Sequence, residues 1–175
     1  SSIEIIRNEH RSIAAVLDGL RYLTRDLQTH PAQADADFRA IRAMLHYLDA
    51  FPARYHHPKE DRYLFAAIRG ATHDGDVTLT SLQDDHAQNE DRMLHIMRET
   101  IRAECQPGRH LAEFVRTIEE FVADYWRHMS LEEDTVFPLA QEVLGPTDWK
   151  RIDAAFQGNS DPLVGAEAGK EFDKL

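Results

Sequence analysis

Histidines paired with carboxylates are the residues of this sequence that could do chemistry. The sequence contains 10 histidines. Two pairs stand out, His56–Glu60 and His128–Glu132, in each of which a glutamate follows a histidine by four residues. Side chains at this spacing project from the same face of a helix, so each pair offers an imidazole beside a carboxylate. Such a nitrogen and oxygen set favours iron, manganese or zinc over copper(I) and iron–sulfur clusters.

Two further histidines occupy apolar stripes of expected helices. His10 lies between Ile6 and Ile13, and His86 follows Leu82 at helical spacing. Burying polar groups is costly unless each finds a partner. One of these histidines alone would suggest a hydrogen-bonded core residue. A cation shared with the two His–Glu pairs would satisfy all of them, so the four positions together predict a buried metal site.

The sequence also contains a weak internal repeat. Residues 56–61 (HHPKED) resemble residues 128–133 (HMSLEE), and residues 8–10 (NEH) resemble residues 84–86 (DDH). We expect two similar helical hairpins, related by an approximate two-fold axis, that present near-equivalent half-sites to two metal ions.

This order of residues resembles the hemerythrin-like (HHE cation-binding) family between Asn8 and Pro138. The resemblance implies a carboxylate-bridged di-iron centre with an oxo or hydroxo bridge, in which manganese or zinc could substitute for iron. It implies histidines as terminal ligands and glutamates as bridges, and these are His10, His56, His86, His128, Glu60 and Glu132.

The sequence departs from the oxygen-carrying hemerythrins at Glu90, where those proteins have a second histidine four residues after the one that corresponds to His86. Glu90 is a seventh candidate ligand, or else it supports the site from outside or lies on the surface. Two octahedral irons offer about twelve coordination positions. About one position stays open if Glu90 binds and about two if it does not. We do not expect stable reversible oxygen carriage, because an anionic oxygen donor favours ferric iron.

Three neighbouring residues are alternatives. Glu133 competes with Glu132 as a ligand but is rotated by about 100° from the stripe, which favours Glu132. His57 and Asp61 are also four residues apart, yet both are rotated off the face of the His56–Glu60 pair. We expect both at the surface or supporting the site.

Four long amphipathic segments must position these residues. Helical periodicity predicts helices at about residues 3–29, 35–70, 77–105 and 111–139, the second bent by Pro52 and Pro58. Gly145-Pro146 ends the fourth and opens a short C-terminal helix. These elements predict an all-α, up-down-up-down four-helix bundle over residues 1–145.

Residues 146–175 are predicted to pack on the bundle as the short helix and an irregular tail. Within the tail, Leu163, Val164 and Phe172 are expected to fold back over the bundle.

Composition narrows the possible partners. The net charge of −11 argues against binding to nucleic acid or to a membrane surface. Cys105 is the only cysteine, which excludes thiolate clusters. No apolar run approaches the roughly 20 residues of a membrane span, and the first ten residues do not resemble a signal peptide. The sequence therefore predicts a cytoplasmic protein, and it leaves the oligomeric state open.

The favoured function is a non-haem di-iron protein that binds or senses oxygen, nitric oxide or peroxide. A binding or sensing role is favoured over catalysis. Peroxide decomposition, and iron–sulfur cluster repair or iron handling, remain the alternatives. A ferritin-like oxidase is disfavoured because no histidine has a glutamate three residues before it.

Overall fold

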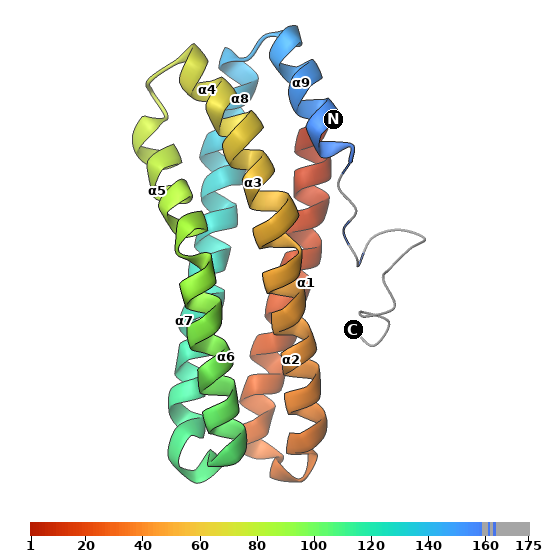
Figure 1. The fold of residues 1–175 in the computed structure, drawn as a ribbon, viewed down its shortest axis with the longest axis vertical. Coiled ribbons are helices and arrows are strands. Elements are labelled where there is room, and N and C mark those ends of the chain that lie inside the picture. Colours follow the sequence, from red (N-terminus) through yellow and green to blue (C-terminus); the bar gives the residue numbers. More distant parts are fainter. Residues whose placement is uncertain (159–160, 162, 164–175) are drawn as a thin grey trace.

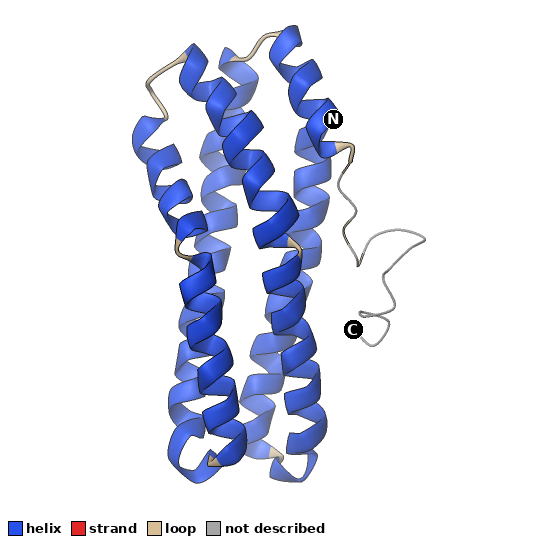
Figure 2. Cartoon of the chain, viewed as in Figure 1, coloured by secondary structure: helices blue, strands red, loops and turns tan. Residues whose placement is uncertain are grey.

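The computed structural model describes residues 1–158, 161 and 163. In these residues every regular element is helical and there is no strand, which confirms the predicted all-α class (Figure 2). The predicted long helices are present as columns, but three of the four columns are interrupted and contain several elements each (Figure 1).

The first column is a single helix. α1 (Ser2–Thr29) runs without a break through the position of His10. A short 3-10 helix, η1 (Pro31–Gln33), turns the chain into α2 (Ala34–Ala50), which packs against α1. The predicted end of the first helix at Thr29 is confirmed.

The second column contains two π-helical stretches, which sequence periodicity does not reveal. After α2 it continues through η2 (Pro52–His56), α3 (His57–Lys59), η3 (Glu60–Phe65) and α4 (Ala66–Ala71). Pro58 has no N–H to donate, and its ring would clash with the carbonyl four residues earlier in an α-helix. The wider turn of η2, just before Pro58, accommodates this proline without ending the column.

The third column differs from the single helix predicted for residues 77–105. It consists of α5 (Asp76–Ala87) and α6 (Asn89–Cys105), which are separated by Gln88. The backbone of Gln88 has ψ −6°, far from the α-helical value, and its N–H donates to the carbonyls of Asp84 and His86. The break therefore lies two residues after His86.

The fourth column repeats the pattern of the second. α7 (Pro107–Leu131) leads into the π-helix η4 (Glu132–Val136) and then α8 (Phe137–Val143). As in η2, a proline follows the π-helical stretch, here Pro138. α9 (Pro146–Phe156) begins at the predicted proline and packs against α1 and η3.

The columns enclose two apolar clusters with polar residues between them. α1 and α6 each pack against both α2 and α7, and Figure 1 shows the chain reversing direction from one column to the next. On α1, Ile6 belongs to one cluster and Ile13 to the other, and His10 lies between them. Likewise Glu132 lies between Met129, which belongs to the cluster of Ile13, and Val136, which belongs to the cluster of Ile6. The histidines and glutamates thus form a layer that divides the core.

The described end of the chain contacts the bundle. Asp161 is buried and accepts a hydrogen bond from the hydroxyl of Tyr47, 3.1 Å away, and Leu163 packs against the core. The predictions for Val164 and Phe172 lie outside the described residues. None of the described helices combines the length and the apolar character that crossing a membrane requires.

Candidate metal centre

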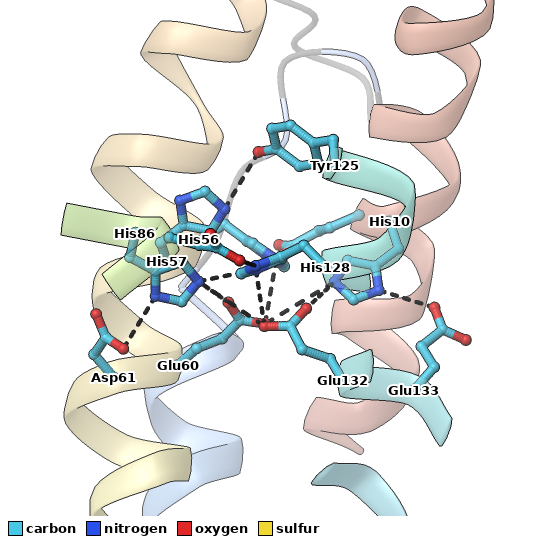
Figure 3. Close-up of polar contacts among 12 residues, drawn as sticks. His10, His56, His57, Glu60, Asp61, His86, Tyr125, His128, Glu132 and Glu133 are labelled. Atoms are coloured by element: carbon cyan, nitrogen blue, oxygen red, sulfur yellow. Dashed lines mark hydrogen bonds and ion pairs between the residues drawn. The ribbon is translucent and has the colours of Figure 1, made fainter. Parts of the chain in front are cut away.

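Side chains from all four columns meet in the middle of the core (Figure 3). We call them the polar layer, and its members are His10, His56, His57, Glu60, His86, His128 and Glu132. Their potential ligand atoms form two groups, each within 4.8 Å of one another: His10, His56, Glu60 and Glu132 in one group, and His57, His86 and His128 in the other.

The first half-site contains His10 and His56, together with one oxygen from each glutamate. Nε2 of His56 lies 3.3 Å from Oε1 of Glu60. Nε2 of His10 lies 3.2 Å from Oε2 of Glu132 and 4.0 Å from Oε1 of Glu60. Two imidazole nitrogens and two carboxylate oxygens therefore face one small volume.

The second half-site contains His86 and His128, together with the opposite oxygens of the same glutamates. Nε2 of His128 lies 3.3 Å from Oε1 of Glu132, and Nε2 of His86 lies 3.7 Å from Oε2 of Glu60. The two Nε2 atoms are 3.0 Å apart. Nitrogens bound at about 2.1 Å to adjacent positions of an octahedral ion would lie about 3.0 Å apart. Each glutamate gives one oxygen to each half-site, as a bridging carboxylate does.

Four carboxylates outside the polar layer contact Nδ1, the ring nitrogen that points away from the half-sites, of four histidines. We call these four the ligand-type histidines: His10, His56, His86 and His128. Two of these contacts lie within a hairpin. In each, the acidic residue just before the lone histidine (His10 or His86) contacts the histidine of the His–Glu pair in the same hairpin. Oε2 of Glu9 lies 2.7 Å from Nδ1 of His56, and Oδ2 of Asp85 lies 3.4 Å from Nδ1 of His128. A carboxylate at Nδ1 keeps the proton there and leaves the Nε2 lone pair directed inward.

The remaining two contacts cross between the hairpins. Asp61, which follows Glu60, lies 3.0 Å from Nδ1 of His86. Glu133, which follows Glu132, lies 2.8 Å from Nδ1 of His10. The four outer carboxylates therefore obey the internal repeat seen in the sequence.

The repeat extends to the backbone and to the apolar packing. Glu60 begins η3 and Glu132 begins η4, so a π-helical turn follows each glutamate. Phe65 at the end of η3 stacks on His86, with ring centroids 5.9 Å apart, and Phe137 stacks on His10 at 6.1 Å. Single π-helical turns often occur at functional sites because they re-aim side chains.

Several buried atoms of the polar layer lack hydrogen bonds. Among the described residues, both carboxylate oxygens of Glu60 and of Glu132 have no hydrogen-bond partner, and neither has Nε2 of His10. Leaving such groups unsatisfied in a core is costly. A cation between the half-sites would satisfy all five atoms, and their nitrogen and oxygen chemistry suits iron, manganese or zinc. The residues present therefore fit a metal site.

Comparison with protein families agrees with this chemistry. The family described as hemerythrin HHE cation binding domain matches residues 1–140. The chain belongs to this family. The match spans the whole polar layer, so the His and Glu cluster lies within an HHE cation-binding domain. No curated protein and no solved structure matches the chain.

Without a cation, protons offset the charge of the HHE domain's carboxylates. Burial and the neighbouring carboxylate of Glu132 raise the pKa of Glu60 well above its usual range. Burial also disfavours ionised Glu132, but His128 and His10 outweigh it and hold the pKa of Glu132 well below its usual range. Burial opposes protonation of His128, yet Glu132 and Asp85 raise its pKa to about 9. The cluster therefore attracts positive charge, as protons or as metal.

The structure brings six of the seven predicted ligands of the HHE domain together: His10, His56, Glu60, His86, His128 and Glu132. The seventh, Glu90, is exposed and lies outside this cluster, on the wall of a cavity of about 440 Å³ that also borders His86. Glu133 contacts the outer nitrogen of His10 and does not join the cluster. Which of these groups bind metal stays a prediction.

His57 is the member of the polar layer that the sequence places at the surface or in support of the site rather than among the candidate ligands. It is buried, and its ring stacks on that of His86 with centroids 4.2 Å apart. The expectation that it points off the site assumed a regular α-helix, in which successive residues rotate by 100°. It directly follows the π-helical η2, where that rotation does not hold. Pro58 was the available signal. The four outer carboxylates occupy equivalent positions of the internal repeat, so the repeat was the signal that could have identified them. Of these four, only Asp61 is named from the sequence as a residue that could support the site.

Proposed function

We propose that this HHE domain holds two iron ions, one in each half-site, with Glu60 and Glu132 as bridging ligands. The observation that carries the proposal is the division of the carboxylate oxygens: each glutamate directs one oxygen to each pair of histidines. On this proposal the interrupted columns act as an up-down-up-down four-helix bundle built around the metals.

We further infer that the centre binds or senses oxygen, nitric oxide or peroxide. Paired irons supply reducible metal with positions open to a small ligand. The residues of the chain hold the ligand-type histidines in one orientation through the outer carboxylates. They also surround the site with two apolar clusters that limit the access of water. Such an oriented polar site between two apolar clusters suits the binding of a small ligand.

Iron loading tests this function. Ferrous iron is added without oxygen, the iron content per chain is measured, and the absorption spectrum is followed after oxygen is admitted. We expect about two irons per chain and the bands of an oxo-bridged diferric centre. Fewer than about two irons, or no such bands, would contradict the proposal.

Glu60→Gln and Glu90→Gln make a matched pair of variants. Burial raises the pKa of Glu60 and so favours its neutral form, which glutamine resembles. Glu60→Gln should therefore fold, but it should retain less than about half of the iron because a bridge is lost. Exposed Glu90→Gln should bind iron as the unmodified protein does. Equal iron content in both variants would rule out Glu60 as a bridge.

A further inference from the structure

The internal repeat breaks at one buried position. His56 and His128 are equivalent in the repeat, but the residue after His56 is His57 whereas the residue after His128 is Met129. Both His57 and Met129 are buried. The two half-sites each have two histidines and one oxygen from each glutamate. They differ in the buried residue that follows the histidine of the His–Glu pair.

His57 lies against the second half-site. Its potential ligand atom is within 4.8 Å of those of His86 and His128, and its ring centroid lies 4.2 Å and 5.7 Å from theirs. Imidazoles in adjacent positions of one octahedral ion would have centroids roughly 4.6 Å apart. His86 and His128 have theirs 4.8 Å apart. The three rings are therefore spaced closely enough to share one ion.

His57 is also chemically available to a metal. Its ring is buried among the rings of His56, His86 and His128. Nε2 lies 3.2 Å from the hydroxyl of Tyr125, as Figure 3 shows, while Nδ1 makes no hydrogen bond with any described residue. Turning the ring, which now lies nearly parallel to His86, toward the metal gives up that one hydrogen bond.

At the first half-site the position equivalent to His57 is filled by Met129, and a cavity lies beside it. Met129 offers a thioether, a soft donor that suits copper(I) rather than iron. Together with His10, Ala14 and Trp126 it borders a cavity of about 200 Å³. Ala14 follows His10 by four residues, as Glu90 follows His86, so the repeat places a small side chain on the wall of this cavity beside His10.

We propose that His57 is the third imidazole ligand of the second half-site, and that a small ligand binds the metal of the first half-site, beside Met129 and through this cavity. The proposal rests on the di-iron function proposed above. A larger cavity borders His86 of the second half-site. With His57 bound, the metal of that half-site has no open position for a ligand that enters from this cavity.

Single substitutions that make His57 and Met129 alike test the proposal. Azide is the probe, because it binds to an open position on ferric iron. Iron-57-loaded protein should show two inequivalent ferric sites in its Mössbauer spectrum and bind azide. Met129→His should keep about two irons, show more similar sites and bind azide at least about tenfold more weakly. His57→Met should also make the sites more similar, but it should keep azide binding. Azide affinity that is unchanged in Met129→His, or lost in His57→Met, would overturn the proposal.

A second pair of variants covers the case in which Met129→His does not fold. Ala14→Leu narrows the cavity at the first half-site, and Ala53→Leu places the same side chain in the cavity beside His86. We expect Ala14→Leu to weaken azide binding about tenfold and Ala53→Leu to leave it unchanged, with iron content equal in both. The reverse result would place the ligand at the second half-site.

The iron content of the unmodified chain separates the two proposals. Fewer than about two irons would overturn the di-iron function, and this inference with it. Two irons, with azide affinity insensitive to Met129→His and to Ala14→Leu, would overturn only the inference.

Discussion

The outer nitrogen of each ligand-type histidine contacts a carboxylate that follows the internal repeat. For His128 this carboxylate is Asp85, and the imidazole in turn lowers the pKa of the Asp85 carboxyl. Asp85 is also 3.1 Å from the guanidinium of Arg92. A charged acceptor held in this way fixes the ring orientation and raises the basicity of the inner nitrogen.

We expect Asp85→Asn to weaken metal binding by about 10- to 100-fold, because an amide holds the imidazole less firmly than a carboxylate does. A metal titration against a competing chelator measures the change. Its neighbour Asp84 is exposed, so Asp84→Asn removes the same charge one residue away and should leave the affinity unchanged. Equal weakening in both variants would indicate a general charge effect rather than an oriented histidine.

At the residue scale, much of the polar layer could be predicted from the sequence. His10 interrupts an apolar stripe, and the His56–Glu60 spacing places both side chains on one face; the structure puts these residues in one cluster. His57 could not be placed because its direction depends on a π-helical turn that leaves no periodic signal. Glu90 was weighed as a ligand by analogy with oxygen carriers, but it is exposed.

At the scale of elements, the positions of the helical columns followed from periodicity but their interruptions did not. Pro58 signalled a disturbance without specifying its form. The break at Gln88 has no glycine or proline beside it, so local sequence carries no mark of it. Such breaks arise from tertiary packing, which overrides the weak helix propensities of single residues.

Pro58→Ala tests whether the proline maintains the π-helical turn. Alanine restores an N–H that can donate to the carbonyl of Arg54, so η2 should relax toward an α-helix. We expect the metal-free protein to gain about 1 kcal/mol in free energy of unfolding, while metal affinity falls several-fold because His56 and His57 rotate. Denaturant titration and metal titration measure the two effects.

Pro146→Ala is the control for that variant. Pro146 occupies the start of α9, where proline is favoured, and it lies away from the polar layer. Its replacement should leave metal affinity unchanged. If Pro58→Ala also binds metal normally, the turn of η2 does not depend on the proline.

At the scale of the whole molecule, the polar layer divides the core into two apolar clusters, and a cation bound there would link the two. The all-α class and the family both followed from the sequence, because periodicity and ligand spacing extend along most of the chain. The boundary predicted at residue 145 stays a prediction, although α9 packs on α1.

Removing the metal should lower the melting temperature by about 10 °C, because a ligand present at about a thousand times its Kd adds about 4 kcal/mol to stability. The loss should grow with pH. The folded-state pKa of His128 is raised to about 9, above its unfolded value, so its contribution is complete below about pH 6.5 and disappears as pH rises through about 9. Calorimetry of metal-free and metal-loaded protein across this range measures both effects.

The metal-loaded protein should lack this decline, since the metal replaces the proton on the inner nitrogen. A metal-free protein whose melting temperature is flat between about pH 6.5 and about pH 9 would contradict the stabilising role assigned to protonated His128.

The crossed contacts of the outer carboxylates make the two hairpins depend on one another. Asp61 of one hairpin orients His86 of the other, and Glu133 returns the contact to His10. Each hairpin therefore depends on the other to orient its lone histidine. Because both hairpins belong to one chain rather than to two identical subunits, equivalent positions are free to hold different residues, as His57 and Met129 do.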